Sequence, residues 1–169
     1  MIDESIFEPF YERTKKALWL YVCRSAGDPS LADDILQEAY IRLLRSGVDA
    51  LNEAKLKSYL YTIATNLMND HYRKRKRDRN LFDESGRGSS GRSPELAGEF
   101  RHDIGNAFGQ LNAQQRALLW LAYVEEYKHH EIGVVLQLRE KSVKVLLFRA
   151  KQKLAQIFKQ MNITSRNMI

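Results

Sequence analysis

The sequence predicts an all-α protein made of two small helical domains joined by a flexible linker. Three observations support this fold class. Apolar residues recur every three to four positions along most of the chain, which is the period of a helix. No stretch of useful length alternates polar and apolar residues as a strand does. Residues 80–103 contain four Gly, four Ser and one Pro and lack hydrophobic periodicity, which is typical of a linker.

The linker divides the 169 residues into a first domain at residues 1–79, a second domain at residues 104–162 and a tail at residues 163–169. As a flexible coil, its 24 residues would span roughly 25–30 Å root-mean-square.

Three helices are expected in the first domain. The first covers residues 7–23, and the second begins with Asp28 as N-cap and Pro29 as first helical residue and runs to about Arg45. A polar connector at residues 46–55 follows. The third helix has apolar residues on one face. Tyr59 and Tyr72 lie on this face, so we predict that both belong to the core. That face consists of Leu56, Tyr59, Leu60, Ile63, Ala64, Leu67, Met68 and Tyr72.

The remaining residues of the third helix lie off its apolar face. Tyr61 is one of them, and the pattern leaves its role open. Thr62 and Thr65 are expected to be exposed, where they could accept a phosphate group.

The second domain has the length pattern of a helix-turn-helix. A helix containing Phe108 is followed by a capping box of Asn112 and Gln115, which opens another helix. A short helix at about residues 128–136, a brief turn and a basic helix at about residues 139–160 complete the motif. Six apolar residues are expected to pack the last two helices together: Ile132, Val135, Leu138, Val143, Leu146 and Leu147.

Charge is unevenly distributed along the chain. Lys and Arg number 27 against 21 Asp and Glu, a net charge of +6 with a pI of about 9.4. Residues 1–40 hold eight acids and four bases (−4), residues 71–79 six bases and one acid (+5), and residues 138–169 eight bases and one acid (+7). Two separate basic blocks predict contact with a polyanion at two places. The competing interpretation is that these cations only form solvated helix faces.

Several function classes are excluded by composition and motifs. The single cysteine, Cys23, rules out a disulfide framework and a cysteine-built zinc site, and His129 and His130 point about 100° apart on a helix. No stretch has the roughly 18–20 apolar residues of a membrane span, and the first residues do not resemble a secretory signal. We therefore expect a cytoplasmic protein without membrane insertion, metal or cofactor. No nucleophile–base pair or phosphate loop is present, so we do not expect an enzyme.

Charge patterning within the helices suggests two kinds of partner. The basic last helix of the helix-turn-helix is typical of DNA binding, and the cationic tail of the third helix, close to tyrosines, suits unstacked bases. Asp34 and Glu38 share a helix face, which is consistent with docking on a basic partner, and Arg42 can offset Glu38 at i+4. The alternative is that the acids of the first turn only stabilise the helix dipole.

Three stretches together resemble the extracytoplasmic-function (ECF) group of bacterial sigma factors. Residues 32–43 (ADDILQEAYIRL) are similar to the region-two pattern A-x-D-[LIV]-x-Q-[ED]-x-[FY]-x-[RK]-[LV]. Residues 60–73 (LYTIATNLMNDHYR) are similar to L-Y-x-I-A-x-N-x-x-x-D-x-x-R followed by basic residues. Residues 127–154 are similar to the region-four helix-turn-helix that ends V-K-x-x-L-x-R-A-x-x-x-L. Order, spacing and linker all agree with the family.

This resemblance implies a promoter-specificity subunit of RNA polymerase, with a region-2 helical bundle as first domain and a region-4 helix-turn-helix as second. Its partners would be the β′ and β subunits of core polymerase, promoter DNA and a regulator, because family members are commonly held inactive by a dedicated anti-sigma factor. The face that binds the β′ coiled coil corresponds to Asp34, Gln37, Glu38 and Arg42. The surface that meets the −10 element corresponds to Asn66, Asn69, Arg73, Lys74, Arg75 and Arg77. The helix that reads the −35 element corresponds to Lys141, Ser142, Lys144, Val145, Phe148 and Arg149, with Lys151 as a further cation.

In the family, the connector that corresponds to residues 47–55 captures an unstacked base of the non-template strand. Some positions depart from the family pattern. Gln137 stands where the turn usually has Gly, Arg139 where a Ser or Thr cap is common, and Phe148 where His is frequent. If Gln137 is left-handed, the side chain costs about 1 kcal/mol. The alternative functions are a stand-alone helix-turn-helix regulator that does not engage polymerase and a basic RNA-binding protein.

Overall fold

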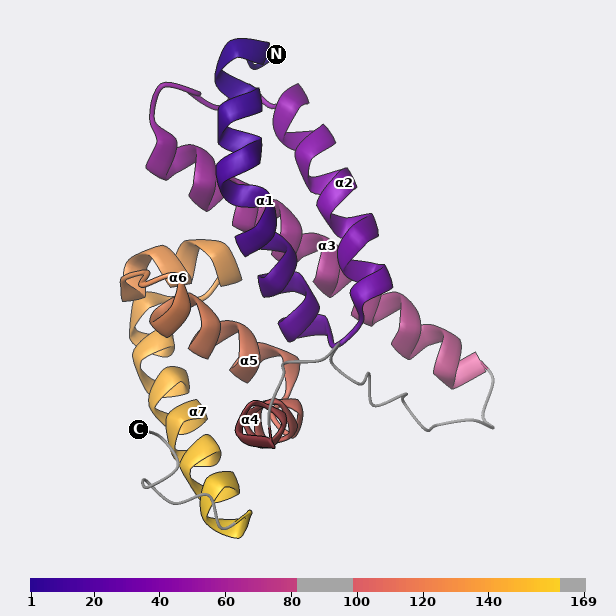
Figure 1. The fold of residues 1–169 in the computed structure, drawn as a ribbon, viewed down its shortest axis with the longest axis vertical. Coiled ribbons are helices and arrows are strands. Elements are labelled where there is room, and N and C mark those ends of the chain that lie inside the picture. The colour runs from indigo at the N-terminus through magenta and orange to yellow at the C-terminus, as the bar shows by residue number, and fades with distance from the viewer. Residues whose placement is uncertain (82–98, 162–169) are drawn as a thin grey trace. The chain divides into compact units, whose positions relative to one another are not determined.

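A computed structural model describes residues 1–81 and 99–161, and these residues form helices and no strand (Figure 1). This confirms the predicted all-α class. The chain divides into two compact units, the first with helices α1 to α3 and the second with α4, α5, α7 and most of α6. Within the described part of the chain, no helix is both long enough and apolar enough to cross a membrane.

The stretch predicted as linker, residues 80–103, overlaps the ends of two helices. Helix α3 continues to Leu81 and helix α4 begins at Glu99, so helical structure enters this stretch from both sides. Residues 82–98 of the predicted linker and the predicted tail at residues 163–169 lie outside the described residues.

Helix α1 (Glu4–Ala26) is longer at both ends than the predicted residues 7–23. It begins early because the Asp3 side chain accepts a hydrogen bond from the Ser5 backbone N–H at 2.8 Å and so caps the first turn. Pro9 lies within the helix, where it lacks the N–H that would bond back to the preceding turn. At the other end, Gly27 has φ 72° and its N–H donates to the Cys23 carbonyl, which stops the helix.

Helix α2 (Pro29–Arg45) begins as predicted. The Asp28 side chain accepts from the backbone N–H groups of Ser30 and Leu31, and Pro29 occupies the first helical position. Helix α3 (Glu53–Leu81) is a single helix of 29 residues, about 43 Å long at the ideal rise. Its basic C-terminal part therefore continues directly from the buried part of the helix.

The three helices pack into one core. Helices α1 and α2 run antiparallel side by side and α3 crosses them (Figure 1), and each helix contacts the other two. The largest fully buried side chains of this unit are Phe10, Leu18, Tyr21 and Val22 from α1, Leu43 from α2, and Leu56, Leu60 and Tyr61 from α3.

Two buried hydroxyl pairs connect α1 to its neighbours. Thr14 Oγ1 donates to the Phe10 carbonyl at 2.8 Å and lies 2.6 Å from the Tyr40 hydroxyl of α2. Burial raises the pKa of Tyr40 to about 12, so its hydroxyl keeps its proton and donates it to Thr14. Tyr21 Oη likewise lies 2.7 Å from Thr65 Oγ1 of α3, and Thr65 donates to the Tyr61 carbonyl. These pairs fix the rotation of α2 and α3 against α1.

The second unit contains α4 (Glu99–Gly109), α5 (Ala113–Leu119), a π-helical turn at Trp120–Val124, α6 (His129–Leu136) and α7 (Glu140–Gln160). The predicted capping box is confirmed, since Asn112 Oδ1 accepts from the Gln115 N–H at 2.8 Å and Gln115 Oε1 accepts from the Asn112 N–H at 3.0 Å. Helices α4 and α5 pack against α7.

Helices α6 and α7 form the predicted helix-turn-helix. Ile132, Val135 and Val143 are fully buried and Leu147 nearly so, whereas Leu138 and Leu146 are half-buried. Gln137 has φ 56°, which confirms a left-handed residue at the turn, and Arg139 is an N-cap whose side chain makes no capping bond.

Gly133 permits the close approach of the turn to α6. Its carbonyl accepts from the N–H groups of Gln137 and Leu138, and a Cβ at Gly133 would lie 2.6 Å from the Leu138 carbonyl oxygen. Since that oxygen belongs to the backbone, a larger residue requires the turn itself to move.

We predict that Gln137→Gly raises the free energy of unfolding of the second unit by up to about 1 kcal/mol, because glycine adopts the left-handed conformation without a Cβ penalty. The same substitution at exposed Gln156, inside α7, should lower it by a similar amount. Denaturant titration followed by circular dichroism measures both. Destabilisation by both variants would contradict the assignment of strain to Gln137.

Gly133→Ala should destabilise the same unit by about 1–3 kcal/mol, since the added methyl group overlaps backbone. Ala replaces Gly without harm at Gly105, where no atom lies within 4 Å of the added Cβ. Equal stability of the two variants in the same titration would show that the turn does not need glycine.

Candidate functional site

The outer face of α2 carries the residues predicted to bind polymerase. Asp34, Gln37 and Arg42 are exposed and Glu38 is half-exposed. Arg42 Nε donates to Glu38 Oε1 at 2.7 Å, which confirms the expected i, i+4 pairing. Such an exposed pair contributes little to stability, so it is available to a partner.

Two further residues on α2 refine this face. Asp33 accepts a hydrogen bond from Trp19 Nε1 at 2.7 Å and is therefore used within the fold. Ile41 is 42% exposed although it is a large apolar residue. It follows Asp34 by seven positions and Glu38 by three, which places all three on one side of the helix. No sequence motif singled out Ile41, although its position outside the buried period of α2 could have identified it.

The polar side of α3 holds the residues predicted to meet the −10 element. Asn66, Asn69 and Arg73 follow one another at spacings of three and four, so they share a helix face, with Asn66 half-buried and the other two exposed. Arg73 Nη1 lies 3.8 Å from Asp70 Oδ1, a loose exposed pair. Beyond it Lys74, Arg75, Lys76 and Arg77 are all exposed. This part of the helix is a strongly positive surface suited to phosphates.

One tyrosine assignment on α3 differs from the structure, and the structure decides a second that the sequence left open. Tyr59, predicted to be core, is 39% exposed, whereas Tyr61, left open, is fully buried against Tyr21 with ring centroids 5.1 Å apart. Tyr72 is half-buried, and its hydroxyl donates to the Ser25 carbonyl. Tyr59 is thus the exposed tyrosine of the three, and it shares a helix face with exposed Lys55. A cation beside an exposed aromatic ring suits single-stranded bases.

The expectation that Thr65 is exposed is wrong. Thr65 is 3% exposed and is engaged with both Tyr21 and the Tyr61 carbonyl, so no modifying enzyme can reach it in the folded protein. Thr62 is half-buried and donates to the Ser58 carbonyl. The helical period placed Thr65 outside the core because α3 contacts two helices and buries a wider surface than one apolar stripe.

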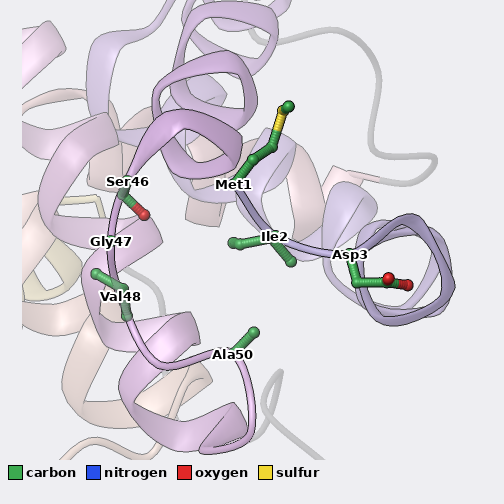
Figure 2. A pocket seen from close by; sticks show the side chains of 7 residues that line it. All are labelled: Met1, Ile2, Asp3, Ser46, Gly47, Val48 and Ala50. Carbon is green, nitrogen blue, oxygen red and sulfur yellow. The ribbon is translucent and has the colours of Figure 1, made fainter.

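The connector between α2 and α3 forms one side of a small open pocket of about 270 Å³ (Figure 2). Ser46, Gly47, Val48 and Ala50 line it from the connector. The first three residues of the chain line the opposite side. Leu51, next in the connector, is 86% exposed.

Helix α7 presents the residues predicted to read the −35 element. Six of them are exposed and Ser142 is half-exposed. Val145 and Phe148 are 49% and 60% exposed, which is unusual for apolar residues in a helix that also buries Val143, Leu147 and Ala150. Exposed apolar side chains among cations can contact base edges in a major groove, while the cations contact phosphates. The exposed residues are Lys141, Lys144, Val145, Phe148, Arg149 and Lys151.

The surroundings of α7 also affect its cations. Lys151 Nζ lies 5.3 Å from the centre of the exposed Tyr123 ring, a cation–π contact that orients this lysine.

His129 and His130 are exposed at the start of α6. Within the described ranges, no three His, Cys, Asp or Glu residues come together as a metal site.

Comparison with known families gives two matches. The family described as sigma-70 region 2 matches residues 10–78, and the family described as sigma-70 region 4 matches residues 101–154. The two matched segments cover the helices of the first and second unit respectively, and together they account for most of the chain.

Curated relatives match nearly the whole chain. The ECF RNA polymerase sigma factor SigL of Mycobacterium tuberculosis is 27% identical over 167 residues, covering 96% of this chain and 94% of SigL. SigM of Bacillus subtilis is 25% identical over 154 residues, covering 89% and 94%. SigW of the same species is 29% identical over 167 residues, covering 90% and 88%.

Two solved structures share the fold. The sigma factor RpoE of Bartonella quintana, solved with the anti-sigma factor NepR, has a TM-score of 0.75 at 21% identity and covers 90% of this chain and 96% of its own. CnrH, solved with the cytosolic domain of CnrY, has a TM-score of 0.66 at 22% identity and covers 94% and 90%.

We predict that Thr65→Val lowers the free energy of unfolding by about 1–2 kcal/mol, because it removes a buried hydrogen bond between the Thr65 and Tyr21 hydroxyl groups. Thr62→Val, three residues away, should change it by no more than about 0.5 kcal/mol, since Thr62 only donates to a carbonyl of its own helix. Urea titration compares the two variants. A larger effect at Thr62 would contradict the role assigned to the buried pair.

Proposed function

The chain belongs to the ECF group of the sigma-70 family, and from this premise we propose how its surfaces engage polymerase and promoter DNA. As a sigma factor it directs promoter-specific transcription, and the family consists of specificity subunits rather than enzymes. We infer that this chain, too, supplies no catalytic group to RNA synthesis.

The proposed polymerase-binding face is the outer side of α2. Asp34, Gln37, Glu38 and Arg42 correspond to the family positions that bind the β′ coiled coil, and all four are accessible. Ile41 adds an exposed apolar side chain to this polar set. Interfaces of this kind use a desolvated apolar contact for affinity and surrounding charges for orientation and association rate.

The proposed −10 surface is the polar side of α3. Asn66 and Asn69 present amide groups that can bond to base edges, and the exposed cations from Arg73 to Arg77 are placed to neutralise phosphates. Tyr59 and Lys55, near the start of the same helix, extend this surface toward the connector, where an unstacked base would be held.

The proposed −35 surface is α7, inserted into a major groove as the second helix of the motif. The observation that carries the whole proposal is that both matched regions expose, on separate units, the side chains expected to contact promoter DNA. A stand-alone regulator would need only the second unit, so the family match of the first unit does not favour that alternative.

Several finer features belong to the same proposal. The two domains predicted at residues 1–79 and 104–162 would bind elements that are separated along the promoter. The chain would act in the cytoplasm and associate with the nucleoid when bound to polymerase. An anti-sigma factor would control it, as the kind of partner with which the structurally similar RpoE was solved.

Reversing two charges on α2 tests polymerase binding. We predict that Asp34→Lys with Glu38→Lys weakens binding to core polymerase by at least about tenfold, since repulsion replaces complementary charge. Glu8→Lys with Glu12→Lys on α1 makes the same charge change at the same spacing and should leave binding within about twofold. Fluorescence anisotropy of labelled protein with core polymerase measures both. Equal binding by the two double variants would rule out α2 as the docking face.

Removing cations from α7 tests the −35 surface. Lys144→Ala with Arg149→Ala should weaken promoter binding by the holoenzyme and reduce the dependence of log K on log salt by about two, one for each lost phosphate contact. Core binding should not change. Lys153→Ala with Lys159→Ala removes the same charge farther along α7 and should have a smaller effect. If both double variants weakened promoter binding equally, the positive charge of α7 would act without specific contacts at Lys144 and Arg149.

A further inference from the structure

The first three residues of the chain form a short strap across the end of α2. The backbone N–H of Ile2 donates to the Leu44 carbonyl at 3.3 Å, and the Ile2 side chain is 7% exposed. Asp3 then caps α1. These contacts tie the start of α1 to the last turn of α2, where the connector begins.

Ile2 also lines the pocket, together with Val48 and Ala50 of the connector. Figure 2 shows the Ile2 side chain on the opposite side of the pocket from Val48. The hydrogen bonds described within the connector are local: the Leu51 N–H donates to Asp49 Oδ1 at 3.0 Å, and the Asn52 N–H donates to the Asp49 carbonyl at 3.4 Å. These bonds shape the connector from within. The strap, which is tied to Leu44 at the end of α2, lines the other side of the same pocket.

The pocket has features that suit a nucleobase. Apolar side chains of Ile2, Val48 and Ala50 offer contact to a flat aromatic face, and backbone groups around Gly47 offer partners to polar edges. The exposed Leu51 and the cation Lys55 follow directly in the chain. The pocket is open to solvent, as entry of a base from a single strand requires.

We propose that Ile2 is a positioning residue for single-strand capture: it holds the connector in the conformation in which the pocket accepts an unstacked base of the promoter. This inference rests on the proposed function and adds to it a part of the chain that precedes the family match, which begins at residue 10. Loss of the Ile2 side chain frees the connector to move, so the pocket is formed for a smaller fraction of the time and the apparent affinity for the base falls in proportion.

The experiment is a double-mutant cycle that combines removal of the Ile2 side chain with removal of the captured base and measures the affinity for the oligonucleotide. Holoenzyme assembled from core polymerase and the full chain is titrated with a single-stranded oligonucleotide of the non-template −10 element, either intact or abasic at one position at a time. For the unmodified protein, removal of one particular base should weaken binding roughly five- to tenfold, as expected for a base held by apolar contact. For Ile2→Ala the same removal should cost about twofold or less, because two contacts that depend on each other do not add.

Two further variants separate positioning from general stability. Ile2→Val keeps most of the apolar contact and should retain the full dependence on the base. Val22→Ala removes buried methyl groups near the other end of α1 and should lower stability without altering that dependence. Binding to core polymerase should be unchanged in all of them.

The proposal is overturned if Ile2→Ala keeps the dependence on the base, if Val22→Ala loses it equally, or if no abasic position weakens the unmodified holoenzyme. The proposed function would fail differently, since in that case the unmodified chain would not bind core polymerase or support any promoter-dependent transcript.

Discussion

The buried Thr–Tyr pairs are the constraint on which the first unit depends. Thr14 with Tyr40 fixes α2 against α1, and Tyr21 with Thr65 fixes α3 against α1. A buried hydroxyl without a partner costs about 1–3 kcal/mol. Rotating either helix would separate the two hydroxyl groups of a pair, so both would lose a hydrogen bond. The functional faces are exposed parts of the same helices. The exposed acids of α2 and the amides of α3 therefore owe their orientation to hydroxyl groups inside the core.

In the second unit, the turn between α6 and α7 orients the exposed face of α7. Gly133 lets the turn approach α6 closely, and the left-handed Gln137 redirects the chain into α7. Val143, Leu147 and Ala150 then anchor α7 in the core, which leaves Val145, Phe148 and the cations pointing outward. Buried contacts thus orient two exposed helix faces in the first unit and one in the second. In the proposed function, binding of one protein partner and two DNA elements is divided among these three faces.

Local chemistry made much of this predictable from sequence. The Asp28–Pro29 start of α2, the Asn112–Gln115 capping box and the helix-turn-helix follow from residues close together in the chain. The errors arose where distant residues decide. Thr65 is buried because Tyr21, 44 positions away, supplies a hydroxyl partner, which no helical period can show. The strap was missed for the same reason, since buried Ile2 bonds to Leu44, 42 positions away at the end of α2.

The central claim is that this chain gives core polymerase promoter specificity, and run-off transcription tests it most directly. Core polymerase and the full chain are incubated with a library of genomic fragments, alongside core polymerase alone. The account predicts transcripts that start at defined positions, only when both components are present. Sequence-specific DNA binding by the chain alone, with no such transcript in the presence of core polymerase, would contradict it and favour a stand-alone regulator.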